Sequence, residues 1–383
     1  HLVVRGSGNQ SILNNSFYLK PSKVLVNGEL RDSCDNFCVL EYEENNITLY
    51  FDVLVDSCKH MFSYSANITE IDLSLFDFSN VTTMYGMFRN CINLKTINFG
   101  NINTSLVNNM ELLFYFCKKL TSIINLSNFN TSSVISMRGM FGYCFDLLSI
   151  DLSNFNTKNV ESFRTFFAYC NISYIDLSNL NFSKVTTMES MFDHCTKLTS
   201  INFGNIDTSS VKNFKNLFRL CEKLESIDIS NFNTSSATDM YQMFYRLFIL
   251  KSLKFPKTFD TSNVNNMCAM FSHCLSLTTL NLSIFDTSKV TDLGYMFHNC
   301  QKLQYLDISH FSPINLTSVD YMFRNMSSLI YLNIYSLDIN SGVKTDKTFH
   351  LTSKDIKICS NNSNTQNYLY SQSFKYNCSD ICF

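Results

Sequence analysis

Large apolar residues recur along this chain with a period of about 26 residues. The clearest marker is a phenylalanine that ends each short apolar run, and it recurs as Phe62, Phe88, Phe114, Phe141, Phe167, Phe192, Phe218, Phe244, Phe271, Phe297 and Phe323. The steps between successive markers are 26, 26, 27, 26, 25, 26, 26, 27, 26 and 26 residues. A period this steady predicts a solenoid, in which each repeat forms one coil of a stack.

Each period changes its spacing halfway. In one copy the apolar positions of residues 185–192 fall at i, i+3, i+6 and i+7, which predicts one face of a short helix. Ile201 and Phe203 alternate with polar residues, as a short strand requires. Thr208 and Ser209 carry side-chain oxygens that suit the start of the next helix. The pattern therefore predicts an α/β solenoid of eleven coils, each with one strand and about two turns of helix.

A single coil cannot bury its apolar side, so the coils must stack. Stacking places equivalent residues in ladders about 4.8 Å apart. We expect Phe88 over Phe114, Ile97 beside Ile123, and Leu152 beside Leu177. We expect a second apolar spine in the loops, built from Phe129, Phe155, Leu180, Ile206 and Phe232. These ladders are the predicted core, and they account for 35 phenylalanines in a chain without tryptophan.

The repeat can be written Val-x-x-Met-x-x-Met-Phe-x-x-Cys-x-x-Leu-x-x-Ile-x-Leu-Ser-x-Phe-x-Thr-Ser. It resembles the BspA-type leucine-rich repeat of 26-residue-repeat surface proteins, which occur in bacteria and protists, and the match runs from about Val55 to Leu337. The resemblance implies a leucine-rich-repeat solenoid at a cell surface, with a role in adhesion or recognition, no enzyme activity and no cofactor. The chain departs from common leucine-rich repeats where they carry an Asn or Cys. Apolar stacking should replace the asparagine ladder there, because the position holds Phe155, Phe232, Phe285 or Phe311.

The repeat divides the chain into a predicted N-terminal β cap (1–54), a solenoid (55–340) and a cysteine-containing C-terminal cap (341–383). A cap is expected because the first coil of an array has no neighbour to cover it. The C-terminal segment is polar, and it is either a cap or the start of a cysteine-rich module.

Three patterns predict strands in the N-terminal cap. Lys23–Val26 followed by Asn27-Gly28 predicts a strand that enters a tight turn. Residues 39–43 and 47–53 predict a hairpin that turns at residues 44–46. Leu2, Val3 and Val4 predict a first strand, although the stretch from His1 to Ser7 also resembles a protease-tag scar.

Charge and hydropathy exclude several classes of partner. The net charge is −2 and no basic run occurs, so we expect neither nucleic acid nor an anionic membrane as partner. No apolar segment approaches the roughly 20 residues that cross a bilayer. The chain starts at His1 without a signal sequence, and we interpret it as a processed product or a fragment.

The fifteen cysteines form two groups. Eight lie three residues after a marker phenylalanine: Cys91, Cys117, Cys144, Cys170, Cys195, Cys221, Cys274 and Cys300. Other repeats place Leu247 or Met326 there, so we expect buried free thiols; disulfides between neighbouring coils are the alternative. The candidates for disulfides at the ends of the solenoid are Cys34, Cys38, Cys58, Cys359, Cys378 and Cys382, and Cys268 is left unpaired.

Sixteen Asn-x-Ser/Thr sequons make N-linked glycans the expected modification, although a chain so rich in Asn, Ser and Thr forms many by chance. They are Asn9, Asn14, Asn46, Asn67, Asn80, Asn103, Asn125, Asn130, Asn171, Asn181, Asn233, Asn281, Asn315, Asn325, Asn361 and Asn377. Together with the terminal cysteines they indicate a secreted eukaryotic glycoprotein, and we expect a protist source. Predicted loops carry the preferred acceptors, Asn67, Asn80, Asn103, Asn130, Asn181 and Asn233.

The sequence offers little for catalysis. His194-Cys195 and His273-Cys274 suggest thiol or metal chemistry, but adjacent side chains point apart and no zinc-ligand spacing occurs. Asp151 and Asp176 should be neighbours on adjacent coils, near the separation of a retaining glycosidase pair. A general acid needs a dry pocket to raise its pKa, however, and an open strand face stays wet.

The exposed face of the strands is the candidate binding face. It combines an Asp/Asn row with a Ser/Thr/Tyr row, and its chosen residues are Asp151, Tyr174, Asp176, Asp228, Tyr305, Asp307 and Tyr331. We expect an extracellular, non-enzymatic surface protein that binds a protein or carbohydrate ligand. The alternative is a structural subunit that assembles head to tail with its own copies into a filament, because capped solenoids present two different ends.

Overall fold

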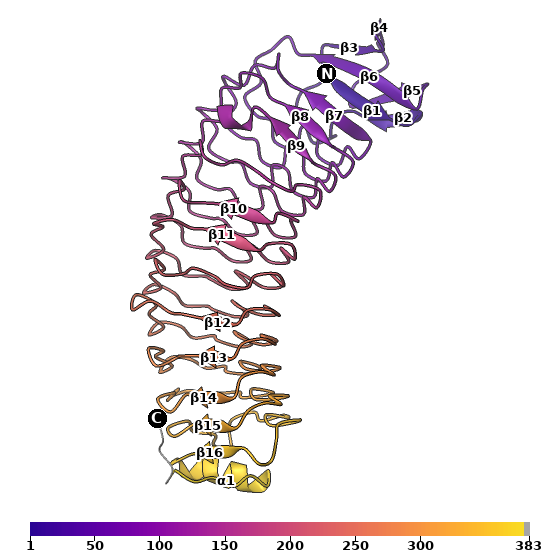
Figure 1. The fold of residues 1–383 in the computed structure, drawn as a ribbon. Coiled ribbons are helices and arrows are strands. Elements are labelled where there is room, and N and C mark those ends of the chain that lie inside the picture. The colour runs from indigo at the N-terminus through magenta and orange to yellow at the C-terminus, as the bar shows by residue number, and fades with distance from the viewer. Residues whose placement is uncertain (379–383) are drawn as a thin grey trace. The chain divides into compact units, whose positions relative to one another are not determined.

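The computed structural model describes residues 1–378, which fall into two compact units, residues 1–184 and residues 185 onward. Within each unit the chain winds into coils that lie one after another, and short strands of successive coils pair in parallel (Figure 1). The predicted solenoid is confirmed. Each unit is described by itself below.

The first unit contains the N-terminal cap and five marker phenylalanines. Its main sheet has the order β4-β3-β6-β1-β7-β8-β9, with β1 (Leu2–Arg5), β3 (Lys23–Val26), β4 (Glu29–Leu30) and β6 (Glu44–Tyr50) from the cap and β7 (Ile68–Asp72), β8 (Thr96–Asn98) and β9 (Ser122–Ile124) from the coils. A second sheet pairs β2 (Gly8–Ser11) with β5 (Phe37–Leu40). The remaining elements are the short 3₁₀ helix η1 (Leu126–Asn128) and β10 (Tyr174–Asp176).

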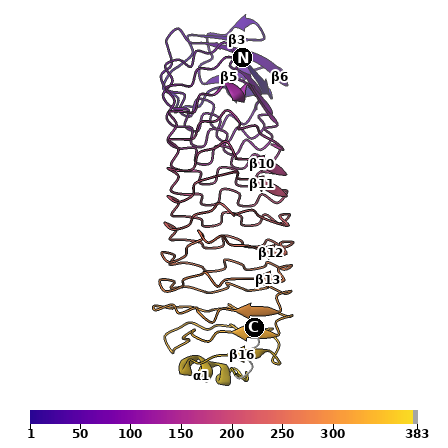
Figure 2. The ribbon, with the colours of Figure 1, turned by 60° about the vertical axis from the view of Figure 1, so that its left-hand side comes forward.

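The second unit continues the repeat. Its strands are β11 (Ser200–Asn202), β12 (Ser252–Leu253), β13 (Thr279–Leu280), β14 (Tyr305–Asp307), β15 (Tyr331–Asn333) and β16 (Lys357–Cys359). They pair as β12-β13 and β14-β15-β16, and the single α-helix of residues 1–378, α1 (Ser363–Ser371), lies beyond β16 (Figure 2).

Strand β1 joins the cap to the first coil. It pairs antiparallel with β6 on one side and β7 on the other, so that Leu2 lies opposite both Ile47 and Ile71. All three side chains are buried. The expectation of a first strand at residues 2–4 therefore holds, and this strand supplies the cover that the first coil needs.

The hairpin expected between residues 39–43 and 47–53 is wrong. Strand β5 pairs with β2, whereas β6 begins at Glu44 and pairs with β1 and β3. The N-terminal strand offers β6 a partner that buries Ile47, which a local hairpin would not do. The tight turn at Asn27-Gly28 does occur, with φ of 52° and 89° at its two residues.

The segment that carries each marker phenylalanine is a series of turns, not the short helix that the spacing suggested. Around Phe88, Gly86 and Asn90 have φ of 58° and 60°, a left-handed conformation that ends a right-handed helix. The N–H of Phe88 donates to the carbonyl of Leu113 on the next coil at 3.0 Å, and the N–H of Arg89 closes a turn onto Gly86 at 3.0 Å. Alternate backbone N–H groups thus donate to carbonyls of the next coil. In a helix these N–H groups would bond within their own coil, and the bonds between coils would be lost.

The predicted apolar ladders form the core. The rings of Phe88 and Phe114 stack with centroids 5.5 Å apart and an angle of 3° between them. Ile97 lies opposite Ile123 in the paired strands. The loop spine is also buried, with exposures of 0 to 5% for Phe129, Phe155, Leu180, Ile206 and Phe232. Aromatic stacking between coils therefore supplies much of the buried apolar contact in both units.

A row of buried threonines lies beside the loop spine. Thr131 donates its hydroxyl to the carbonyl of Asn156 on the next coil at 3.0 Å and accepts the N–H of Asn156 at 2.8 Å. Seven coils have a buried threonine at this position, and others have Phe78, Phe182 or Pro313 there; the threonines are Thr104, Thr131, Thr157, Thr208, Thr234, Thr261 and Thr287. Thr208 was expected to cap a helix, but it bridges to Asn233 instead. Threonine hydroxyls, together with apolar stacking, thus tie the loops together.

The coil geometry continues past the expected boundary at residue 340. Phe349 follows Phe323 by 26 residues, and the two rings stack at 5.1 Å. Lys347 and Leu351 have the left-handed φ found around the other markers. Helix α1 and the segment after it then cover this coil, since the rings of Phe349 and Phe374 lie 4.8 Å apart.

Candidate binding faces

The strand face presents the polar rows that the repeat predicted. Asp151 and Asp176 in the first unit, and Asp228 and Asp307 in the second, are all exposed. Each also has a structural task, because an Oδ1 atom accepts the N–H two residues later, as from Ser153 to Asp151 at 2.9 Å. Such turns end the strand and fix the direction of the carboxylate.

Tyrosines rise from the same face. Tyr174 and Tyr305 are each 50% exposed. Tyr305 lies opposite Tyr331 in the paired strands β14 and β15, with Asp307 opposite Asn333 two residues further on. The second unit therefore holds two neighbouring tyrosines beside a carboxylate and an amide on rigid strands.

The carboxylates of this face lack the environment of a general acid. Hydrogen bonds from Ser153 hold the pKa of Asp151 below its usual value, and Ser230 does the same for the pKa of Asp228. A proton donor requires the opposite shift, which burial would provide. The geometry suits binding through carboxylate acceptors better than proton transfer.

The histidine–cysteine pairs do not form reactive couples. Cys274 is fully buried and donates to the carbonyl of Phe244 at 3.2 Å, and burial raises the pKa of its thiol to about 12. His273 faces the other way and contacts Ser272 and Tyr245. His194 makes a 2.8 Å contact with Asp193. Within residues 1–378 no group of three or more His, Cys, Asp or Glu side chains is arranged to hold a metal ion.

All eight ladder cysteines are buried, each at 0% exposure. Along the ladder the S–H group donates to the carbonyl of the marker phenylalanine one coil earlier, as Cys117 does to Phe88 at 3.0 Å and Cys221 to Phe192 at 3.1 Å. Thr352 occupies the same position in the coil of Phe349 and donates to Phe323. The position is thus a buried donor site, and not only an apolar one.

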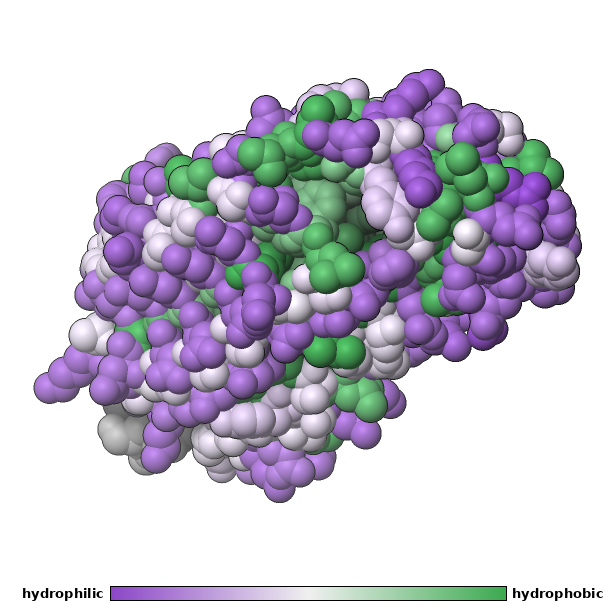
Figure 3. Space-filling model, turned by 90° about the horizontal axis from the view of Figure 1, so that it is seen from above, coloured by the Kyte–Doolittle hydropathy of each residue, from purple (hydrophilic) through white to green (hydrophobic). Residues whose placement is uncertain are grey.

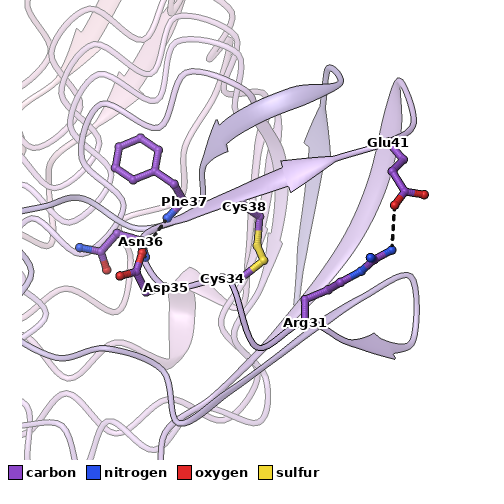
Figure 4. Close-up of a disulfide and its surroundings, with 7 residues drawn as sticks. All are labelled: Arg31, Cys34, Asp35, Asn36, Phe37, Cys38 and Glu41. Atoms are coloured by element: carbon purple, nitrogen blue, oxygen red, sulfur yellow. Dashed lines mark hydrogen bonds and ion pairs between the residues drawn. A yellow bond between two sulfur atoms is a disulfide. The ribbon is translucent and has the colours of Figure 1, made fainter.

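Two disulfides lie near the ends of the described chain. Cys34 pairs with Cys38 in the cap, next to an Arg31–Glu41 ion pair of 3.1 Å (Figure 4). Cys359 of β16 pairs with Cys378. Cys58, expected as a disulfide partner, is a free and fully buried thiol, because it takes the buried position that Met84 and Met110 hold in the next coils. Cys268 is also a free thiol, and Cys382 lies outside the described residues.

The sequons differ in whether the asparagine side chain is exposed or is half-buried with its amide already hydrogen-bonded. Asn80, Asn103, Asn130 and Asn181 are exposed on loops. Others are half-buried with the amide engaged in a hydrogen bond, as for Asn14, Asn67, Asn171 and Asn325. The exposed loop sequons are therefore the best placed glycan acceptors, whereas Asn67 and half-buried Asn233 are less well placed than the sequence indicated.

An apolar hollow opens in the first unit where the cap meets the first coil. Its volume is about 420 Å³, and its walls include Leu49, Phe51, Leu54, Met61 and Phe76. Figure 3 shows hydrophobic side chains around a hollow on the face seen from above. The sequence contains a sign of this hollow, because most later coils carry asparagine at the position of Leu75. Leu75 lies at the rim of the hollow and is 89% exposed.

A second polar face, which we call the turn edge, comprises the two residues after each marker phenylalanine and the residue two before it. In the first unit the guanidinium of Arg89 lies over the rings of Tyr64 and Tyr115, at 5.7 and 6.0 Å. In the second unit Arg219 and Arg246 lie over Tyr245, at 5.8 and 5.5 Å. The sequence analysis missed this face, although Tyr, Arg and His recur at these positions.

Comparison with known proteins places the repeat in a family. A family model described as "Mycoplasma protein of unknown function, DUF285" matches residues 56–173, 165–256 and 250–361. This chain belongs to the DUF285 family. No curated protein matches the sequence. Within residues 1–378 of this DUF285 protein, no helix is both long and apolar enough to cross a membrane.

Three solved structures resemble the DUF285 repeat. A leucine-rich repeat protein from Bacteroides ovatus has a TM-score of 0.43 at 16% identity, covering 81% of this chain and 91% of that one. A leucine rich cell surface protein from Faecalibacterium prausnitzii has a TM-score of 0.43 at 19% identity, covering 84% and 86%. The pneumococcal vaccine antigen PcpA has a TM-score of 0.37 at 12% identity, covering 82% and 89%. The expected protist source has no support in these comparisons.

Proposed function

We propose that this DUF285 protein is a non-enzymatic, extracellular binding protein of the BspA type, which recognises a protein or carbohydrate ligand through its strand face. The observation that supports the proposal most directly is the paired Tyr305 and Tyr331 beside Asp307 on adjacent strands. A half-exposed tyrosine offers both an apolar ring and a hydroxyl at low entropic cost, because the strand already holds its backbone. The face is polar enough to stay soluble while unoccupied.

The disulfides support a location outside the cytosol. Cys34–Cys38 and Cys359–Cys378 are cross-links of a kind that persists in oxidising compartments and is rare in reducing ones. Glycans at Asn80, Asn103, Asn130 or Asn181 belong to the same proposal, since these side chains are exposed on loops. Mass measurement before and after deglycosylation tests this part.

The binding role is tested with the full chain on arrays of bacterial, host and plant glycans and of surface proteins. The ligand with the strongest signal is then titrated against Tyr305→Ala and Tyr331→Ala variants. We expect each variant to lose at least tenfold in affinity, because each truncation removes a large contact from the centre of the face. Tyr370→Ala is the matched control, since Tyr370 is 80% exposed on α1, away from the strand face. Equal losses in all three variants would refute the strand face as the binding surface.

Head-to-tail assembly into a filament has less support. The outer edge of β16 is already paired, because Ile358 bridges to Tyr376 and accepts the N–H of Asn377 at 2.9 Å. At the cap, the edge strand β4 has two residues and carries Glu29 next to Arg31, which suits an edge that avoids pairing. Negative-stain microscopy of native material distinguishes filaments from single particles.

A further inference from the structure

Five basic side chains form a continuous row along the turn edge of the second unit. We call Arg246, His273, His298, Arg324 and His350 the cationic row. The rings of His273 and His298 lie 4.7 Å apart. Nη1 of Arg324 lies 3.4 Å from Nε2 of His298, and Nε of Arg324 donates to Nδ1 of His350 at 3.3 Å. The row is therefore assembled from five successive coils, each of which contributes one residue.

Tyrosine rings hold both guanidinium groups in place. Arg246 lies over Tyr245 at 5.5 Å, and Arg324 lies over Tyr321 at 5.4 Å. Tyr245 also contacts the ring of His273, with centroids 5.5 Å apart. A guanidinium stacked on an aromatic face still presents N–H groups in its plane to an oxyanion. On Arg324 the Nε and Nη1 atoms already contact His350 and His298, so Nη2 is the group that remains for the anion.

The positive charge of the row has no acidic counterpart among residues 1–378. Neither Arg246 nor Arg324 forms an ion pair there, whereas Arg219, one coil before Arg246, pairs with Asp193 at 3.2 Å. The carboxylates on these coils have other partners: Asp292 accepts the N–H of Gly294, and Asp320 accepts the N–H of Asp346. The Nε atom of Arg246 is buried without a hydrogen-bond partner.

The two central imidazoles are kept neutral by this environment. Burial lowers the pKa of His273 to about 4, with further lowering by Arg246 and Arg324. Burial also lowers the pKa of His298 to about 4, helped by His273 and Arg324. No carboxylate of the described residues acts on either ring, so both imidazolium forms lack a counter-charge. A bound anion would supply one.

We propose that the cationic row binds a phosphate or sulfate ester group, which the guanidinium groups of Arg246 or Arg324 grip while His273 and His298 donate hydrogen bonds. The source of the ester is a substituent on a glycan. The site lies on a different face from Tyr305 and Tyr331, so it does not depend on the strand-face proposal. Binding should tighten as the pH falls from 8 to 5, because the bound anion favours protonated imidazoles.

The test is an NMR titration of the histidine ring signals in the full chain with inorganic phosphate, and with sodium chloride at matched ionic strength as the control. We expect phosphate, and not chloride, to raise the pKa values of His273 and His298 by at least one unit. Arg324→Gln and Arg246→Gln should each weaken phosphate binding at least fivefold. Arg219→Gln, which removes a guanidinium already paired with Asp193, should leave it unchanged.

Glucose 6-phosphate and glucose 6-sulfate then show which ester the row prefers, and binding of either supports the proposal. Equal shifts in phosphate and chloride would mean ionic screening alone and would overturn it. Unchanged phosphate affinity in both Arg246→Gln and Arg324→Gln, with native circular dichroism, would also overturn it.

Discussion

At the residue scale, the ladder cysteines act as hydrogen-bond donors inside an apolar stack. A thiol is small enough for the space between coils, and its S–H gives a marker carbonyl a second donor. The carbonyl of Phe88, for example, accepts the N–H of Cys91 at 3.1 Å and the S–H of Cys117 at 3.0 Å. Two natural substitutes also carry a donor, since Thr352 makes the same contact and Ser65 occupies the corresponding position in the first coil. Leu247 and Met326 fill the position without a donor. Because the carbonyl keeps its backbone donor when the thiol is lost, the S–H bond contributes about 0.5–1.5 kcal/mol, as an ordinary buried hydrogen bond does.

We predict that Cys117→Ala lowers the free energy of unfolding by about 1 kcal/mol, because the carbonyl of Phe88 loses its second donor, the S–H of Cys117. Cys117→Thr should cost less, since the hydroxyl can replace the thiol as it does at Thr352. Urea denaturation measures both. Cys268→Ala is the control, because Cys268 is only partly buried and lies outside the ladder. A threonine variant as unstable as the alanine variant would contradict the donor role.

We also predict that stability falls between about pH 6.5 and pH 4. The folded-state pKa values of His273 and His298, about 4, lie below the usual histidine value of 6.5. Below pH 6.5 the unfolded chain therefore binds protons that the folded chain does not, which favours unfolding. The measurement is the free energy of unfolding at pH 7.0 and 5.0, without phosphate. A His273→Gln/His298→Gln variant should show a smaller loss, and an unchanged loss would contradict the assignment.

At the scale of the element, left-handed residues decide the form of each coil. The spacing of residues 185–192 fits a helix, yet Ser190 and His194 adopt φ of 56° and 59°. Two such residues in each coil turn alternate amides toward the next coil, as when Phe218 donates to Met243 at 3.0 Å. The bonds between coils outnumber those that one short, isolated helix would form, and a helix of two turns is marginal by itself.

The disulfide of the last strand, Cys359–Cys378, should stabilise the fold more than the disulfide of the cap, Cys34–Cys38. Cys359–Cys378 closes a separation of 19 residues, and Cys34–Cys38 one of 4. Loop-closure entropy predicts a stabilisation of about 3 kcal/mol for the first and about 2 kcal/mol for the second.

We therefore predict that Cys359→Ser/Cys378→Ser speeds amide hydrogen exchange in β16 and α1. Cys34→Ser/Cys38→Ser is the matched control, and it should leave exchange in β16 and α1 unchanged. Exchange in β16 that stays as slow as in the unaltered protein would show that packing of Phe374 on Phe349 suffices.

At the scale of the whole molecule, the architecture is a series of coils, each stabilised by its neighbours. Stability in such arrays is close to a sum of terms for single coils and for the interfaces between them. A whole coil should then be removable, whereas a fraction of one should not. Thr291 and Thr317 occupy equivalent positions, since each donates to the coil before it.

We predict that deletion of residues 292–317 leaves a folded protein, because Ser318 then follows Thr291 in the register that Asp292 had. Deletion of residues 292–304 should abolish cooperative unfolding, since it puts strand residues where the turns belong. Urea titration followed by circular dichroism measures both, and the whole-coil deletion should lower the denaturant slope in proportion to the surface lost. Equal damage from the two deletions would contradict independent coils.

The sequence alone determined the period of the repeat, the stacking of equivalent coils and the residues of the core. Side chains such as Phe88 and Phe114 must be buried, and only a stack of equivalent coils buries all of them at once. The same reasoning identified the polar strand face, because alternation along a strand follows from local geometry. The turns around Phe349 were overlooked because the polar residues after Leu337 weaken the pattern that the markers carry.

Only the tertiary structure decided which backbone groups pair between coils and which side chains meet there. The pairing of β6 with β1, and not with β5, depends on strands that are 40 residues apart in sequence. The threonine bridges, the thiol donors and the cationic row all join residues from different coils, about 26 positions apart. Local pattern places each of these residues on a coil, but their contacts arise only when one coil lies on the next.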